Sequence, residues 1–155
     1  MKNVLFVCHG NICRSPMAEF IFKDMVRKAG LEGGRIDSAA VSCEEEGNDI
    51  YPPAKRTLQE HGVPFGKHRS HRVTDAEASE YDAIVIMDSS NRRLLSRILS
   101  PDNMSKVHPI MEYAGKSSDV SDPWYTGDFE RTYRDISEGC AGLLQSLTAY
   151  RTPRR

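Results

Sequence analysis

Residues 4–16 constrain the fold of this chain more than any other segment. An apolar run at 4–7 is typical of a buried strand; a loop containing Gly10 follows it, and a helical pattern begins at Pro16. A strand that leads through a glycine-containing loop into a helix gathers backbone N–H groups at one point, close to the positive end of the helix dipole. The segment therefore predicts an anion-binding loop at the end of a strand.

Two reactive side chains bracket this loop, Cys8 at its start and Arg14 at its far end. Converging N–H groups favour the thiolate form of a cysteine, and a guanidinium offers a planar fork that matches two phosphate oxygens. The pattern indicates displacement at phosphorus, with Cys8 as the nucleophile. The predicted phosphate-binding residues are His9, Gly10, Asn11, Ile12, Cys13, Arg14 and Ser15. The simpler alternative is a buried structural cysteine before an ordinary helix with Ser15 as its N-cap.

Strand and helix signals alternate along the rest of the chain. Strands are predicted at 4–7, 35–41, 83–87 and 106–110, and helices at 16–29, 53–61, 91–99 and 128–150. Such alternation predicts an α/β fold in which helices cover both faces of a parallel sheet. The length of 155 residues fits a single domain over 1–155. Ligands in this architecture bind beyond the carboxyl ends of the strands, where Cys8 is expected to lie.

Composition narrows the class of protein. The net charge is −1 without a basic stripe, so we expect no nucleic-acid partner. The N-terminal apolar run is too short for a signal-peptide core, and no stretch suggests membrane insertion. The cysteines Cys8, Cys13, Cys43 and Cys140 do not form the pattern of a secreted disulfide framework. We therefore expect a cytoplasmic protein.

Taken together, the loop residues resemble the signature of a known family. Cys8, Gly10, Asn11, Cys13, Arg14, Ser15 and Pro16 are similar to the signature of the low-molecular-weight protein tyrosine phosphatases. The resemblance implies a three-layer fold with four parallel strands in the order 2-1-3-4. It also implies cofactor-free hydrolysis of phosphotyrosine in proteins through a cysteinyl-phosphate, with inorganic phosphate or a similar oxyanion held in the loop. We expect a monomer.

A phenolate leaving group needs a proton, so this chemistry requires a general acid. Asp122 is the candidate, because Pro123 restrains it to extended backbone and two aromatic residues follow it. Trp124 and Tyr125 are expected to wall a slot for an aromatic ring, together with Ile12 and Glu44. The segment matches the Asp-Pro-aromatic-aromatic sequence of the family, except that Tyr is usual where this chain has Trp124. Without the loop, the same segment would read as a turn anchored by two aromatics.

Further positions match the family as supports of the loop, namely Ser15, Ser38, His68 and Asp88. Ser15 is expected to donate its hydroxyl to the thiolate and to act as N-cap. Asp88 has a plain helix cap as its alternative, and His68 a structural role elsewhere. Cys13 is either a small buried loop residue or the partner of Cys8 in a reversible disulfide.

The sequence leaves three alternative functions. The closest alternative is a protein-arginine phosphatase of the same fold. In the resemblance, those enzymes have Thr where this chain has Ile12, and an apolar side chain at this position suits a phenyl ester better. Arsenate reduction would need relay cysteines after the third strand, and residues 80–100 contain none. A zinc or redox module would use Cys8, Cys13, His68 and His71, but the spacings are atypical and Arg14 would oppose a cation, so we predict no metal site.

Overall fold

A computed structural model describes residues 2–149 and shows strands alternating with helices. The strands are β1 (Val4–Cys8), β2 (Ile36–Ala40), β3 (Ala83–Ile86) and β4 (Val107–Pro109). The helices are α1 (Arg14–Lys28), α2 (Pro52–Glu60), α3 (Asp75–Ala78), α4 (Ser89–Leu95), α5 (Pro101–Met104), α6 (Pro123–Thr126) and α7 (Phe129–Ala149), and a 3-10 helix η1 spans Ile110–Ala114.

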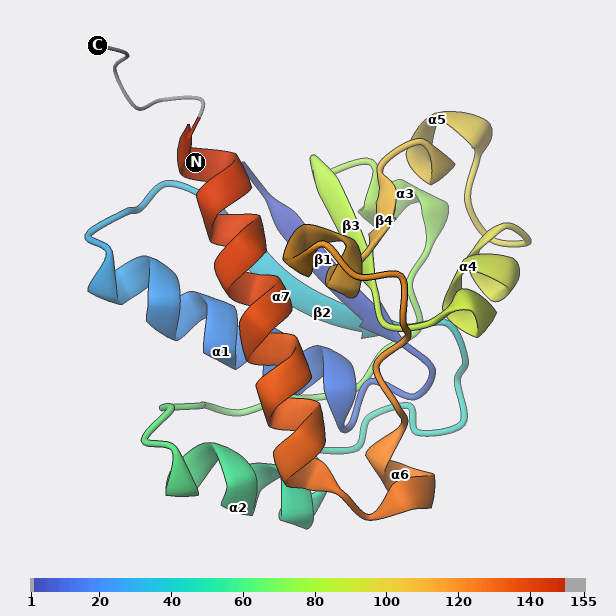
Figure 1. The fold of residues 1–155 in the computed structure, drawn as a ribbon. Helices are drawn as coiled ribbons and strands as arrows, with labels where there is room; N and C mark the ends of the chain where they lie inside the picture. Colours follow the sequence, from blue (N-terminus) through green and yellow to red (C-terminus); the bar gives the residue numbers. More distant parts are fainter. Residues whose placement is uncertain (1, 150–155) are drawn as a thin grey trace, which may run out of the picture.

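The four strands form one parallel sheet in the order β2-β1-β3-β4, as predicted (Figure 1). All five residues of β1 are buried, because strands on both sides complete its hydrogen bonds and helices cover both of its faces. The chain leaves β1 toward β2 on one side and later returns to β3 on the other. The carboxyl end of β1 is therefore a topological switch point, and Cys8 occupies it.

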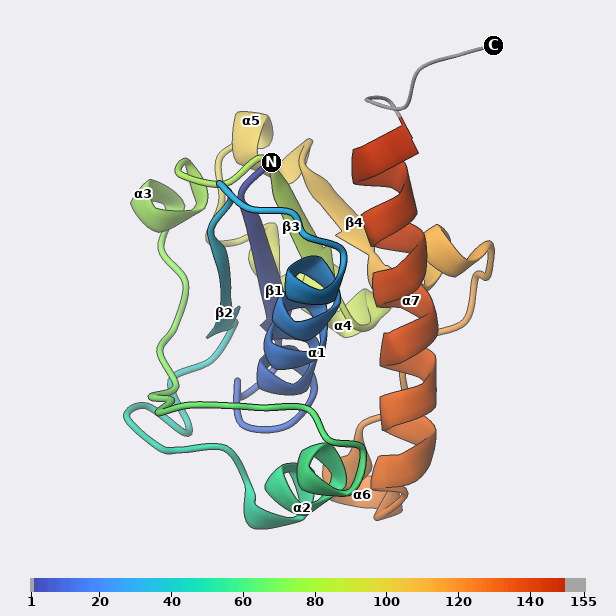
Figure 2. The same cartoon turned by 90° about the vertical axis from the view of Figure 1, so that its left-hand side faces the viewer.

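Two separate hydrophobic cores make the fold three layers deep. The residues of β1 alternate between them: Phe6 packs against the α1 and α7 side, while Leu5 and Val7 face the α3 and α4 side. In Figure 2, α1 and α7 run side by side along one face of the sheet. Gly139 and Gly142 let α7 approach η1 closely, because a Cβ at Gly142 would lie 2.0 Å from a backbone oxygen of η1. This contact fixes the segment that leads from the sheet to α6.

Several predicted boundaries were wrong in detail. Helix α1 begins at Arg14 rather than at Pro16, α4 covers Ser89–Leu95 rather than 91–99, and the other boundaries within the described residues agree to within one residue. The end predicted for the last helix, Tyr150, lies outside the described residues. The short helices α3, α5, η1 and α6 were missed, because four or five residues are too few to show a periodic pattern. No helix within residues 2–149 has the length and apolar character needed to cross a membrane.

Candidate active site

The loop between β1 and α1 directs its hydrogen-bond donors at one sulfur atom. The backbone N–H groups of Asn11 and Ser15 point at Cys8 Sγ from 3.3 and 3.4 Å, and Ser15 Oγ lies 3.0 Å from it. Asn11 has a φ of 61°, the only positive value at a non-glycine residue within 2–149, and this turns its N–H inward. The loop therefore has the inward-facing donors that an anion-binding site requires, with a thiol at its base.

Ser15 does not cap helix α1. The N-cap position is Cys13, which makes no side-chain cap bond, and the Ser15 hydroxyl faces Cys8 instead. The interpretation of Ser15 as an N-cap was therefore wrong, and the first turn of α1 keeps N–H donors for the loop. A sulfur atom or an anion takes the place that a capping side chain would fill.

Asn11 links the loop to the sheet and to α1. Its Nδ2 donates to Ser15 Oγ (2.8 Å) and to Ser38 Oγ (3.0 Å), and the Ser38 hydroxyl donates to Glu19 Oε1 (2.6 Å). His68 Nε2 lies 2.7 Å from the Asn11 carbonyl oxygen, which accepts a hydrogen bond from the ring. Asn11 and Ser15 are 0% exposed, so these bonds are made away from water. Ser38 and His68, two of the predicted supports of the loop, thus both contact the loop residue Asn11.

Sequence reasoning missed two members of this network. Glu19 is buried in α1 as the acceptor of the Ser38 hydroxyl, and Ser70 Oγ donates to the Gly10 carbonyl oxygen at 2.7 Å. A signal existed for Glu19, since a carboxylate among the apolar residues of a buried helix face needs a partner. Ser70 lies 60 positions from the loop and carries no such signal.

The two terminal nitrogens of Arg14 have different hydrogen-bond partners, and the residue also lines the pocket. Its NH1 donates to Asp88 Oδ2 at 2.7 Å and to the Val120 carbonyl oxygen at 3.0 Å. Its NH2 donates to Asp122 Oδ2 at 3.3 Å. Burial works against the charge of Arg14, but Cys8 and the two carboxylates outweigh it, so the pKa of the guanidinium is raised. Arg14 therefore stays a cation although it is only 2% exposed.

Asp88 combines the two roles that the sequence left open. One oxygen accepts from Arg14, and the other accepts from Asn91 N at 2.8 Å in the capping box of α4. The helix cap thereby orients the carboxylate that orients Arg14.

Asp122 lies at the N-cap of α6 and contacts NH2 of Arg14, whereas Asp88 contacts NH1. Its Oδ1 accepts from Trp124 N at 3.1 Å, and its Oδ2 faces Arg14. The side chain is 27% exposed, so this carboxyl group is reachable from the pocket. Asp122 therefore forms a turn, as the alternative interpretation predicts, and also lines the pocket.

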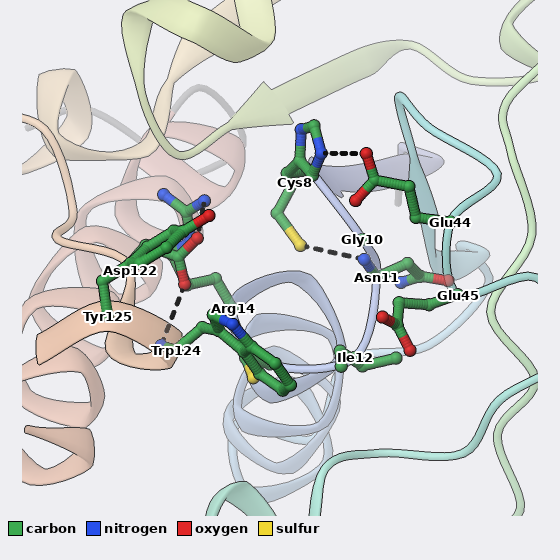
Figure 3. Close-up of a pocket in the computed structure, with 12 residues that line it drawn as sticks. Cys8, Gly10, Asn11, Ile12, Arg14, Glu44, Glu45, Asp122, Trp124 and Tyr125 are labelled. Atoms are coloured by element: carbon green, nitrogen blue, oxygen red, sulfur yellow. Dashed lines mark hydrogen bonds and ion pairs between the residues drawn. The ribbon is translucent and has the colours of Figure 1, made fainter. Parts of the chain in front are cut away.

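These residues surround a pocket of about 160 Å³ (Figure 3). Glu44 and Glu45 line it on one side, and Trp124 and Tyr125 line the other. The pocket is lined by Cys8, His9, Gly10, Asn11, Ile12, Cys13, Arg14, Glu44, Glu45, Asp122, Trp124 and Tyr125. His9 Nε2 lies 3.4 Å from Glu44 Oε2, which joins the loop to the acidic side. Glu45 was not among the residues predicted for the slot.

The remaining cysteines and histidines do not form a metal site. Burial raises the pKa of the Cys13 thiol, which disfavours the thiolate that a zinc ion would need. His68 bonds to the loop, while His71 Nε2 lies 2.7 Å from Glu77 Oε2. Within residues 2–149 no three His, Cys, Asp or Glu side chains are grouped so that they could hold a metal ion. The geometry thus does not support the zinc module.

Comparisons with known proteins agree with this geometry. The family model described as "Low molecular weight phosphotyrosine protein phosphatase" matches residues 3–152. The low molecular weight protein-tyrosine-phosphatase YfkJ of Bacillus subtilis is 39% identical over 150 residues, which cover 95% of this chain and 96% of YfkJ. The crystal structure of YfkJ matches with a TM-score of 0.92 at 37% identity and covers 98% of each chain.

A second similar protein is described as a Drosophila arginine phosphatase. Its crystal structure matches with a TM-score of 0.87 at 31% identity and covers 99% of this chain and all of the other. The matched family model spans nearly the whole chain, and YfkJ shares more than a third of its residues. This chain therefore belongs to the low-molecular-weight phosphotyrosine protein phosphatases, a family of phosphoric monoester hydrolases.

Proposed function

We propose that this protein hydrolyses phosphotyrosine in protein substrates through a cysteinyl-phosphate on Cys8. The observation that carries the proposal is the convergence of the Asn11 and Ser15 N–H groups on Cys8 Sγ, with the Ser15 hydroxyl 3.0 Å from the same atom, at the base of a pocket that Arg14 and Asp122 also line. Donors aimed at a sulfur favour its thiolate form, which is the nucleophile. The single domain, the monomeric state and the cytoplasmic location are further parts of this proposal.

In the first step, Cys8 Sγ attacks phosphorus, so that a sulfur–phosphorus bond forms and the ester phosphorus–oxygen bond breaks. In this proposal the loop N–H groups and the Arg14 guanidinium, which lines the pocket, hold the equatorial phosphoryl oxygens. Because Asp88 and the Val120 carbonyl hold NH1, the guanidinium plane is oriented before substrate arrives. Asp122 gives a proton to the departing phenolate oxygen.

In the second step, Asp122 takes a proton from water, and the water oxygen attacks the phosphorus of the cysteinyl-phosphate. The sulfur–phosphorus bond breaks, and inorganic phosphate leaves. The departing thiolate regains its hydrogen bond with the Ser15 hydroxyl, which stabilises the leaving sulfur. The same carboxyl group serves as acid and then as base, so one residue completes the cycle.

Turnover of matched phosphopeptides tests the proposal. Peptides carrying phosphotyrosine, phosphoserine or phosphoarginine in one sequence are compared by phosphate release. We expect the phosphotyrosine peptide to be hydrolysed fastest and Cys8→Ser to abolish release from it. Turnover by Cys8→Ser at the wild-type rate would refute the mechanism, and equal turnover of phosphoserine would refute the substrate class.

A second candidate function is hydrolysis of phosphoarginine, favoured by the match to the Drosophila arginine phosphatase. Ile12 weighs against it, because this apolar β-branched side chain lines the pocket where a polar phosphoguanidine would have to lie. If the phosphoarginine peptide is hydrolysed faster than the phosphotyrosine peptide, the second candidate replaces the first.

A further inference from the structure

Tyr51 connects the phosphate loop to the aromatic side of the pocket, although it does not line the pocket itself. Its backbone N–H donates to the Ile12 carbonyl oxygen at 2.8 Å. Its carbonyl oxygen accepts from Ala54 N and Lys55 N, the first donors of α2. The backbone of Tyr51 is therefore fixed on both sides, by the loop and by the helix that it begins.

The ring of Tyr51 packs against the wall residue Trp124. The two ring centroids are 4.8 Å apart, and the ring planes are tilted by 51°. Phe129 is a second aromatic neighbour of Tyr51, with a centroid distance of 6.0 Å. Tilted pairs at this distance are favourable aromatic contacts. Tyr51 thus gives Trp124 a ring partner from a separate part of the chain, more than 70 positions away in sequence.

Trp124 needs such a partner to keep its place. It is 51% exposed and sits in α6, a helix of four residues that is too short to be stable by itself. The bond from Trp124 N to Asp122 fixes its backbone but leaves the indole side chain free to rotate. A partly exposed side chain on a short helix samples several rotamers unless neighbouring groups restrain it.

Because Tyr51 bonds to Ile12 through its backbone and packs on Trp124 through its ring, it sets the spacing between two residues that line the pocket. We propose that Tyr51 is a positioning residue that determines the preference for aromatic esters by holding the Trp124 indole at the pocket wall. This inference rests on the proposed function, in which a phenyl ring enters that pocket. Substrates that bring only a phosphate group need the loop and not the wall.

Fluorescence tests the contact independently of catalysis, because Trp124 is the only tryptophan of the chain. Replacement Tyr51→Leu should lower the emission anisotropy of Trp124 and increase its quenching by acrylamide. Tyr51→Phe should leave both as in the wild type, since it keeps the ring. Tyr133→Leu is the matched control. It removes a different aromatic contact, the stack of Tyr133 in α7 on His61, in which Trp124 takes no part.

Kinetics tests the consequence for substrate choice. With Tyr51→Leu, KM for phenyl phosphate should rise about three- to tenfold, the equivalent of one aromatic contact, with kcat within about twofold. The inhibition constant of inorganic phosphate should not change, because that anion contacts the loop alone. Tyr51→Phe should restore the wild-type KM, and Tyr133→Leu should not raise it.

Two results would overturn the inference. One is a parallel rise in the inhibition constant of inorganic phosphate, which would mean that Tyr51 supports the loop and not the wall. The other is an unchanged KM or unchanged fluorescence in Tyr51→Leu. If the wild type itself does not hydrolyse phenyl phosphate, the proposed function fails; the fluorescence series and the affinity for phenylphosphonate then still decide whether Tyr51 holds Trp124.

Discussion

The base of the pocket and its rim are built in opposite ways. At the base, Asn11 and Ser15 are 0% exposed and Arg14 is 2% exposed, and each makes several hydrogen bonds. At the rim, Trp124 and Tyr125 are 51% and 83% exposed. Buried polar networks fix geometry, whereas exposed side chains contribute shape and charge at low cost to stability. In the function proposed above, the base carries out the reaction and the rim selects the substrate.

Among the residues around Cys8, the largest expected effect is at Arg14. Replacement Arg14→Lys should lower kcat/KM by about 10²–10³-fold, because an ammonium group cannot bond Asp88, the Val120 carbonyl and a phosphoryl oxygen in one plane. Steady-state kinetics with p-nitrophenyl phosphate measures this loss. A loss below about threefold would show that only the charge of Arg14 matters.

Asp122 lies between base and rim, and its contribution should depend on the leaving group. Replacement Asp122→Asn keeps an acceptor for Trp124 N but removes the proton donor. Turnover of phenyl phosphate should fall by about 10²-fold or more, while p-nitrophenyl phosphate, which has a more stable leaving group, should lose less in its first step. Single-turnover kinetics on both substrates checks this. Equal losses for the two substrates would argue against Asp122 as the acid.

The network behind the base should matter to stability as well as to rate. Replacement Ser38→Ala leaves Glu19 Oε1 and Asn11 Nδ2 each short of a buried partner, so the free energy of unfolding should fall by about 1–3 kcal/mol. Urea unfolding measures it. Ser42→Ala, which removes the partly buried bond from Ser42 to the His9 carbonyl, is a milder control next to the same loop. Equal effects of the two variants would show that the Asn11 network has no special weight.

The acidic side of the rim should select substrates by charge. Glu44 and Glu45 line the pocket mouth, so acidic residues beside phosphotyrosine should be disfavoured at low salt. The double replacement Glu44→Gln, Glu45→Gln should shift the ratio of kcat/KM between basic and acidic peptides by about three- to fivefold toward the acidic peptide. High salt should remove the difference in the wild type. A preference of the wild type for acidic peptides would contradict the role of this side.

The smallest effect is expected outside both regions, at His71. Its hydrogen bond to Glu77, despite partial burial, raises the pKa of His71 above its ordinary value of 6.5. The protonated pair therefore stabilises the fold fully below about pH 6.5, and this contribution is lost as the pH rises through the higher folded value. His71→Gln should lower the urea midpoint slightly at about pH 5.5 and hardly at all at pH 9. A larger effect at the higher pH would reverse the sign and contradict the pairing.

The base was predictable from sequence because its residues are neighbours in the chain. Cys8, Asn11, Arg14 and Ser15 lie within eight positions, so a local motif specifies the contacts that Asn11 and Ser15 make with Cys8 Sγ. The choice of Asp122 as the candidate acid followed from the proposed chemistry, because a phenolate leaving group requires a proton donor. The parallel sheet and its order were also predictable, since buried strands alternate with amphipathic helices and the resemblance supplied the order.

What the sequence did not reveal depends on contacts between distant residues. The Val120 carbonyl meets Arg14 across 106 positions, and no residue type marks a backbone acceptor. The packing of Tyr51, the residue before α2, on Trp124 of α6 joins two distant segments, and no sequence pattern marks it. The predicted start of α1 was wrong because Ser15 is a residue type that often caps helices. In the structure its hydroxyl contacts Cys8 Sγ instead.

Trapping the covalent intermediate tests the central claim most directly. In Asp122→Ala, p-nitrophenyl phosphate should still phosphorylate the enzyme, because its leaving group departs without a proton, while hydrolysis of the intermediate should be slow. Acid quenching followed by peptide mass spectrometry should then locate one phosphoryl group on Cys8. A phosphoryl group on another residue, or turnover without any phosphorylated enzyme, would contradict the account.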